Sequence, residues 1–241
     1  MATNYQITIS MSDETLTALT DSGYYLYGFK GVSTSMKNGA PLVWFQSQAY
    51  SQSTLIQWQE QYQAYTSTNA IIPGGHIAAS AAYNIDLEQT LNVTGQSGIG
   101  QVVKGGTPGA ISIVNQTSSH TPFTCGISQT QTIAGGASFN TPLCAFPLHG
   151  VGTDVMAPIE RCLLMFATEQ VNTGTVISKA YCEGIVADLT GGAPRSLSFD
   201  IDKGWSWDGG AWASSVAAQT QLAPLLISSS TVSSISRKLV A

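Results

Sequence analysis

The most restrictive feature of this sequence is a strict alternation of polar and apolar side chains over residues 55–65. One set of alternate positions holds Gln57, Gln59, Gln61 and Gln63, and the other holds Ile56, Trp58, Tyr62 and Ala64. Successive side chains of a strand point to opposite faces of its sheet, so this pattern predicts a half-buried β-strand. The apolar face needs a second layer to cover it, which favours a sandwich or a barrel.

Strand-like segments separated by Gly or Pro turns recur along the whole chain, whereas the period of an amphipathic helix is nearly absent. One short helix is expected after Ser12, which is a suitable N-cap residue. The apolar run Ile159–Phe166 is interpreted as a buried central strand, and residues 1–65 as an antiparallel meander. The expected fold is therefore all-β: an antiparallel β-sandwich or flattened barrel with one or two short helices, in a single domain over residues 1–241.

Charged residues make up only 10% of the chain, and the formal net charge is -5. Roughly 25% is usual in a soluble domain, so hydroxyls and amides supply most of the polarity here. Such a surface offers many hydrogen bonds but little long-range field, which suits sugars, lipid head groups or further copies of the chain. Nucleic acid is not an expected partner, because phosphate binding needs clustered positive charge. The only adjacent basic pair, Arg237 and Lys238, is interpreted as a solvated tail.

The beginning of the sequence lacks the basic and apolar segments of a signal peptide, and no run has the length of a membrane helix. We therefore expect cytoplasmic synthesis, with release by a non-classical route as an open alternative. The four cysteines have the spacing of neither a metal knuckle nor a redox motif. They are expected to be buried thiols, with two disulfides as the alternative if the protein acts outside the cell: Cys125, Cys144, Cys162 and Cys182.

Enzyme motifs are missing from the sequence, including nucleophile elbows, zinc-binding motifs and phosphate-binding loops. We therefore expect a non-enzymatic protein without a cofactor or metal. A hydrolase with an unrecognised site is a less favoured alternative, and Glu60 and Asp200 are the acids to consider for it. Asp200, Asp202 and Asp208 also offer enough oxygen atoms for a weak calcium site, although we favour a role in keeping a strand end soluble.

Glu60 is the most unusual single charge. Strict alternation places it on the apolar face between Trp58 and Tyr62, where an unpaired carboxylate is costly. A bulge that turns it outward is the first explanation, because bulges are common where a strand changes its face. A partner such as Arg161 is the second, and a place in a pocket lining is the third.

Three tryptophans lie close together among glycines in residues 205–212. Exposed indole rings stack on sugars and also settle at membrane interfaces, so either ligand fits. Alternatively these rings fill one end of the core, as large aromatic side chains usually do. We take Trp205, Trp207, Asp208 and Trp212 as the candidate ligand-binding residues.

The segment from Gly105 to Thr153 contains no Asp, Glu, Lys or Arg. Hairpins that insert into membranes as β-barrels avoid charge on their lipid-facing side, so this segment is a candidate insertion hairpin. The favoured alternative is ordinary strand and loop, because the whole chain is poor in charge.

The low-charge β composition resembles, at the level of class, that of cytosolic lectins and cytolysins used in defence. The leading hypothesis is a non-enzymatic recognition protein that binds cell-surface glycans or membrane lipid head groups, as lectins or pore-forming toxins do. The alternative hypothesis is a self-assembling structural protein, such as the subunit of a shell, fibre or crystal. We expect the protein to form a homo-oligomer.

Overall fold

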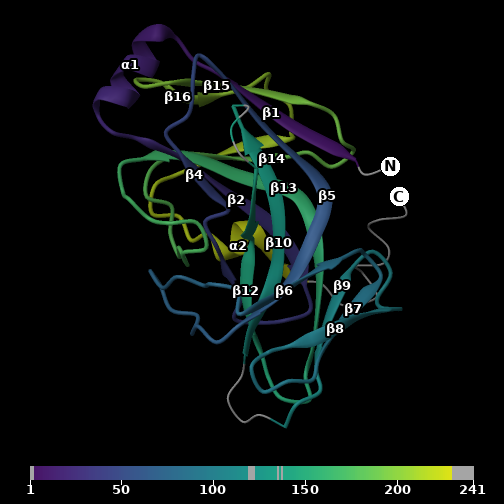
Figure 1. Cartoon of the computed structure of the whole chain (residues 1–241). Helices are drawn as coiled ribbons and strands as arrows, with labels where there is room; N and C mark the ends of the chain where they lie inside the picture. The colour runs from purple at the N-terminus through teal and green to yellow at the C-terminus, as the bar shows by residue number, and fades with distance from the viewer. Residues whose placement is uncertain (1–2, 119–122, 135, 137, 230–241) are drawn as a thin grey trace.

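Two large β-sheets pack against each other in this protein (Figure 1). The computed structural model describes residues 3–118, 123–134, 136 and 138–229. The first sheet has the strand order β16-β15-β1-β5-β10-β12-β3, with β6 beside β5 and β11 beside β10. The second has the order β17-β14-β13-β9-β7-β8, and β2 also pairs with β13 and carries β4 and β18.

The two sheets draw their strands from the whole chain. The first sheet contains β1 (Asn4–Ser10), β3 (Ala40–Pro41), β5 (Ser53–Ser67), β6 (Ala81–Ile85), β10 (Phe123–Ile133), β11 (Phe139–Pro142), β12 (Cys144–Leu148), β15 (Arg195–Asp200) and β16 (Gly204–Ser206). The second contains β2 (Tyr25–Thr34), β4 (Phe45–Ser47), β7 (Gln89–Val93), β8 (Gly100–Lys104), β9 (Ile111–Asn115), β13 (Thr153–Ala167), β14 (Gly184–Asp188), β17 (Ala213–Val216) and β18 (Ile227–Ser229). The helices are α1 (Asp13–Asp21) and α2 (Ala223–Leu226).

The prediction of an all-β sandwich with short helices is confirmed, although both sheets are mixed. The pairs β1–β15, β2–β18 and β7–β9 are parallel, and the other strand pairs described are antiparallel. The expected meander over residues 1–65 is wrong, because β1 pairs with β5 in the first sheet while β2 pairs with β13 in the second. Nearly every side chain of β2 is buried, so this strand requires cover on both faces.

Local sequence signals set the first helix as expected. The Ser12 hydroxyl accepts a hydrogen bond from the backbone nitrogen of Thr15 at 3.1 Å, which satisfies one free donor of the first turn. Gly23 follows the helix with φ of +70°, a conformation that suits glycine. Neither helix of the described residues has the length and apolar character needed to cross a membrane.

The core between the sheets is built mainly on two long strands, β5 and β13. Ile159–Phe166 lies within β13, as predicted, and every residue from Cys162 to Ala167 is buried. On β5, the Trp58 ring packs edge-on against the Trp44 ring, with centroids 5.5 Å apart. One continuous apolar cluster includes residues of both sheets. Organisation of residues 1–241 as a single domain stays a prediction.

Each of these two strands carries a bulge near its middle. On β5, Trp58 pairs with Gln131 and Tyr62 with Gln129, so three residues of β5 lie opposite Thr130 alone. On β13, Ile159 pairs with Gly31 and the next pair is Cys162 with Lys30, which leaves Glu160 and Arg161 outside the ladder with β2, although Arg161 still pairs with Asp188 of β14. Such bulges bend a strand and redirect its side chains, and these two position the features described next.

Candidate functional site

Trp205 lies on β16 at the edge of the first sheet, and its ring packs into the core. Only 9% of the residue is exposed. Its ring stacks on Phe166 at a centroid distance of 5.5 Å and contacts Phe199 at 5.0 Å. The face of this indole is therefore occupied by the core and is not open to a ligand in this conformation.

The other three residues of the predicted aromatic site form a compact, half-exposed turn. The Trp212 indole nitrogen donates to Asp208 Oδ1 at 2.8 Å, and the Trp207 indole nitrogen donates to the Gly210 carbonyl at 2.9 Å. Hydrogen bonds from the Gly210 backbone nitrogen and from Trp212 hold the pKa of Asp208 below its usual value. The Arg195 guanidinium lies 4.9 Å from the centroid of the Trp212 ring. Trp207, Asp208 and Trp212 thus lie together, but their polar groups already bond to one another.

The acids suggested for calcium do not form a metal site. Asp200 Oδ1 accepts hydrogen bonds from the backbone nitrogens of Asp202 and Lys203, which lower the pKa of Asp200. Asp208 is engaged by the aromatic turn instead. Within the described residues, no three acidic, histidine or cysteine side chains converge as metal ligands.

The outer face of the first sheet carries amide and hydroxyl side chains without charge across three neighbouring strands. Along β5, Gln57, Gln59 and Gln61 are exposed, while the residues between them point inward. In the β1–β5 ladder, Asn4 lies opposite Gln59 and Gln6 opposite Gln57. The polar alternation that predicts β5 therefore continues sideways into a polar surface, which we call the amide face: Asn4, Gln6, Gln57, Gln59, Gln61, Thr130, Thr132 and Ser138.

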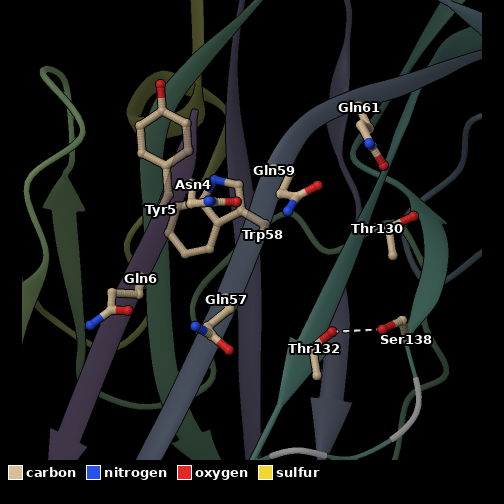
Figure 2. Close-up of a pocket in the computed structure, with 10 residues that line it drawn as sticks. All are labelled: Asn4, Tyr5, Gln6, Gln57, Trp58, Gln59, Gln61, Thr130, Thr132 and Ser138. Carbon is tan, nitrogen blue, oxygen red and sulfur yellow. Dashed lines mark hydrogen bonds between the residues drawn. The ribbon is translucent and has the colours of Figure 1, made fainter. Parts of the chain in front are cut away.

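A groove of about 580 Å³ lies in the amide face. Figure 2 shows its lining, with residues of β1, β5 and β10 side by side and the Thr132 hydroxyl bonded to that of Ser138. Besides the eight residues of the amide face, Tyr5 and Trp58 contribute to it. None of the described residues that line the groove is charged.

The bulge in β5 explains why the groove lies here. β1 pairs with β5 only as far as Gln59, and β6 takes the same edge of β5 from Tyr62 onward. Among the described residues, no strand pairs with the stretch of β5 between these two contacts on that side. On the other side, the Gln129 side chain donates to the Gln59 carbonyl at 2.7 Å and so satisfies a backbone group released by the bulge.

Glu60 lies inside this bulge, half-buried on the inner face of β5. The first explanation from the sequence is right about a bulge, but the bulge does not turn the side chain outward. Its partner is Tyr5, whose hydroxyl donates to Glu60 Oε1 at 2.6 Å. Arg161 instead pairs with Asp188, with its Nη2 atom 3.5 Å from Asp188 Oδ2. Strict alternation placed the Glu60 carboxylate on the apolar face, but the favoured explanation that a bulge turns it outward is wrong, and the sequence could not identify its partner on another strand.

A second pair of charges is buried beneath the groove, and sequence reasoning missed it. The Lys30 ammonium on β2 contacts Glu160 Oε2 on β13, and the Trp58 indole nitrogen donates to the same oxygen at 2.8 Å. The Lys30 side chain has no exposed surface. Its nitrogen lies 4.8 Å from the Trp58 ring centroid and 5.9 Å from that of Tyr5. The sequence does hold one signal for this pair: Lys30 lies within a predicted strand, in a chain that has few charged residues.

A third buried acid lies at the other end of the sandwich. Asp154 on β13 is 1% exposed, and Cys125 Sγ on β10 lies 3.0 Å from its Oδ2. Burial raises the pKa of Asp154 to about 6. All four cysteines are free; Cys125, Cys144 and Cys162 are buried as predicted, and Cys182 is half-buried. The disulfide alternative is therefore wrong.

The uncharged segment from Gly105 to Thr153 is divided between the two sheets. β9 pairs with β7 and β13, whereas β10, β11 and β12 belong to the first sheet. Insertion into a membrane stays a prediction. The basic pair at residues 237–238 lies outside the described residues.

Comparison with known proteins yields no match: none is found among family models, curated proteins or solved structures.

Proposed function

We propose that this protein is a non-enzymatic recognition protein that binds a neutral glycan in the groove of the amide face. The observation that carries the proposal is the uncharged lining of that groove, in which carboxamides and hydroxyls predominate. Sugar hydroxyls both donate and accept hydrogen bonds, and carboxamides offer both kinds of group in a fixed geometry. The affinity of a neutral ligand does not depend on the few charges of this chain.

The availability of these amides supports the proposal. The side chains of Gln57, Gln59 and Gln61 make no hydrogen bond to other described residues, unlike Gln63, which donates to Asn84 at 2.9 Å. Tyr5 and Trp58 form a stacked pair, with ring centroids 5.7 Å apart, beneath this surface. A ligand would therefore meet polar groups that have no internal partner, on a base held rigid by aromatic packing.

Replacing Gln57 and Gln61 together with glutamate is expected to abolish most glycan binding. The change removes two amide donors and adds charges that a neutral sugar cannot compensate, so affinity should fall at least about tenfold, equivalent to about 1.4 kcal/mol. The measurement is binding of the purified protein to a panel of immobilised neutral polysaccharides, followed by titration of the best of them. Gln101→Glu, an exposed glutamine on β8, is the matched control and should bind as wild type does.

The ionic strength of the assay separates a glycan from a charged lipid surface. Binding through neutral hydrogen bonds should change little between low and high salt. Lack of binding to any neutral polysaccharide, together with salt-sensitive binding to anionic vesicles, would contradict the proposal. Large particles formed without a ligand would favour the structural-subunit hypothesis instead.

The aromatic turn provides an independent comparison. Replacing Trp207 and Trp212 with alanine is expected to weaken glycan binding less than the glutamate substitutions do, because the Arg195 guanidinium lies over the Trp212 ring and both indole nitrogens are already bonded within the turn. The two variants are titrated against the same polysaccharide. A loss of binding in the tryptophan variant alone would transfer the site from the groove to the turn.

A further inference from the structure

Lys30 and Glu160 form the most secluded reactive pair in the described part of the chain, and the proposed glycan site does not use them. The Lys30 side chain is fully covered, and 10% of the Glu160 side chain is exposed. Beside its contact with Glu160 Oε2, the Lys30 nitrogen lies 3.3 Å from the Ile159 carbonyl oxygen. The rings of Tyr5, Trp44 and Trp58 surround it within 6.0 Å.

We propose that Lys30 and Glu160 react with each other to form an intramolecular isopeptide bond, an amide between the lysine Nζ and the glutamate Cδ. Proximity supports this, because Nζ already contacts a carboxylate oxygen and the carbon to be attacked is one bond further. A reaction between groups held in contact avoids the entropy cost of bringing them together.

The reaction needs an uncharged pair. An amine must be neutral to attack and a carboxyl group must be protonated to lose water. Transfer of one proton from Lys30 to Glu160 within the contacting pair supplies both forms without changing the net charge. That transfer leaves a neutral amine in contact with a carboxylic acid.

Trp58 is placed to stabilise the addition step. When Nζ bonds to Cδ, negative charge develops on the carboxyl oxygens, and the Trp58 indole N–H already points at Oε2 from 2.8 Å. The second oxygen, Oε1, carries the proton first transferred from Lys30; it takes a second proton from the nitrogen and leaves as water, so that one hydrogen stays on the amide nitrogen. One C–N bond forms, one C–O bond breaks, and no oxidant or further reactant is required. The limited exposure of Glu160 provides the route by which water leaves.

The product would lock the centre of the second sheet. Lys30 and Glu160 belong to adjacent strands, β2 and β13, and the bulge on β13 places Glu160 outside the backbone ladder. An amide there replaces a buried ion pair with a neutral link whose carbonyl oxygen keeps the Trp58 hydrogen bond. The link would join distant parts of the chain without cysteine chemistry.

Mass spectrometry of the denatured full-length protein tests the proposal. The wild-type chain is expected to be lighter than its sequence mass by one water molecule. Tryptic digestion should give a branched peptide that joins the fragment ending at Lys37 to the fragment 105–161, because an acylated Lys30 is not cleaved. The branched peptide distinguishes the link from a cyclised Asp208–Gly209 step, which also loses water.

K30R is the matched control, because it retains a buried cation but cannot form this amide under the same conditions. It should show its full sequence mass and a normal cleavage at position 30. A wild-type chain that keeps its full sequence mass, with free Lys30 in its tryptic peptides after prolonged incubation of the folded protein, overturns the proposal. Both readings are made on unfolded chains, so they do not depend on how well the control folds.

Discussion

Replacing Lys30 with methionine is expected to lower the free energy of unfolding by about 3–5 kcal/mol. Methionine fills much of the same volume, so the principal loss is electrostatic. Glu160 is left as a nearly buried carboxylate, with the Trp58 indole as its remaining side-chain partner among the described residues. Guanidinium unfolding at neutral pH, followed by tryptophan fluorescence, measures the change.

The surface pair of Lys203 with Asp200 supplies the control for this prediction. Its nitrogen and oxygen lie 3.6 Å apart, but the Lys203 side chain is 84% exposed, so K203M should leave stability unchanged within error. The double variant K30M/E160L should be more stable than K30M, because an apolar pair leaves no buried charge. A K30M protein as stable as wild type would show that the buried pair contributes little. If the isopeptide bond has formed, K30M also removes a cross-link and its loss is larger.

Strands and caps could be predicted from this sequence because their signals are local. The alternation at residues 55–65 depends only on which face each side chain occupies, and β5 shows that pattern directly. Ser12 likewise caps a helix through a neighbour three residues away. The meander failed for the opposite reason. No local sequence feature indicates that β1 pairs with β5 while β2 pairs with β13, which lies far along the chain.

In the candidate site, too, local features could be predicted from the sequence and long-range contacts could not. Sequence alternation located the exposed glutamines of β5, but the groove exists only because the ladders place Asn4 and Gln6 beside them on β1. Alternation showed that Glu60 is an unusual charge on the apolar face, but it could not identify the partner Tyr5, since the two lie far apart in sequence. Within residues 205–212, no local sequence feature distinguishes a tryptophan that packs in the core from one that is exposed to a ligand. Trp205 proved to be buried, whereas Trp207 and Trp212 are half-exposed.

Replacing Asp154 with asparagine is expected to stabilise the protein at neutral pH and to have no effect near pH 4. Burial raises the pKa of Asp154 from its usual value of 3.8 to about 6. The folded state therefore holds this proton more tightly than the unfolded state does. As pH rises from 4 to 7, ionisation of the buried carboxylate costs the wild type about 3 kcal/mol, since each pKa unit corresponds to about 1.36 kcal/mol. Asparagine avoids this cost and keeps an oxygen for the Cys125 thiol.

The difference between the two unfolding curves removes the contributions of groups that do not interact with Asp154, because both proteins contain them. Urea unfolding at closely spaced pH values should give a stability gain that grows between pH 4 and 6 and then levels off. Asp202→Asn, at an exposed position beside β16, should show no such pH-dependent gain. A constant difference between D154N and wild type at all pH values would mean that packing, and not ionisation, determines the energetics of this carboxylate.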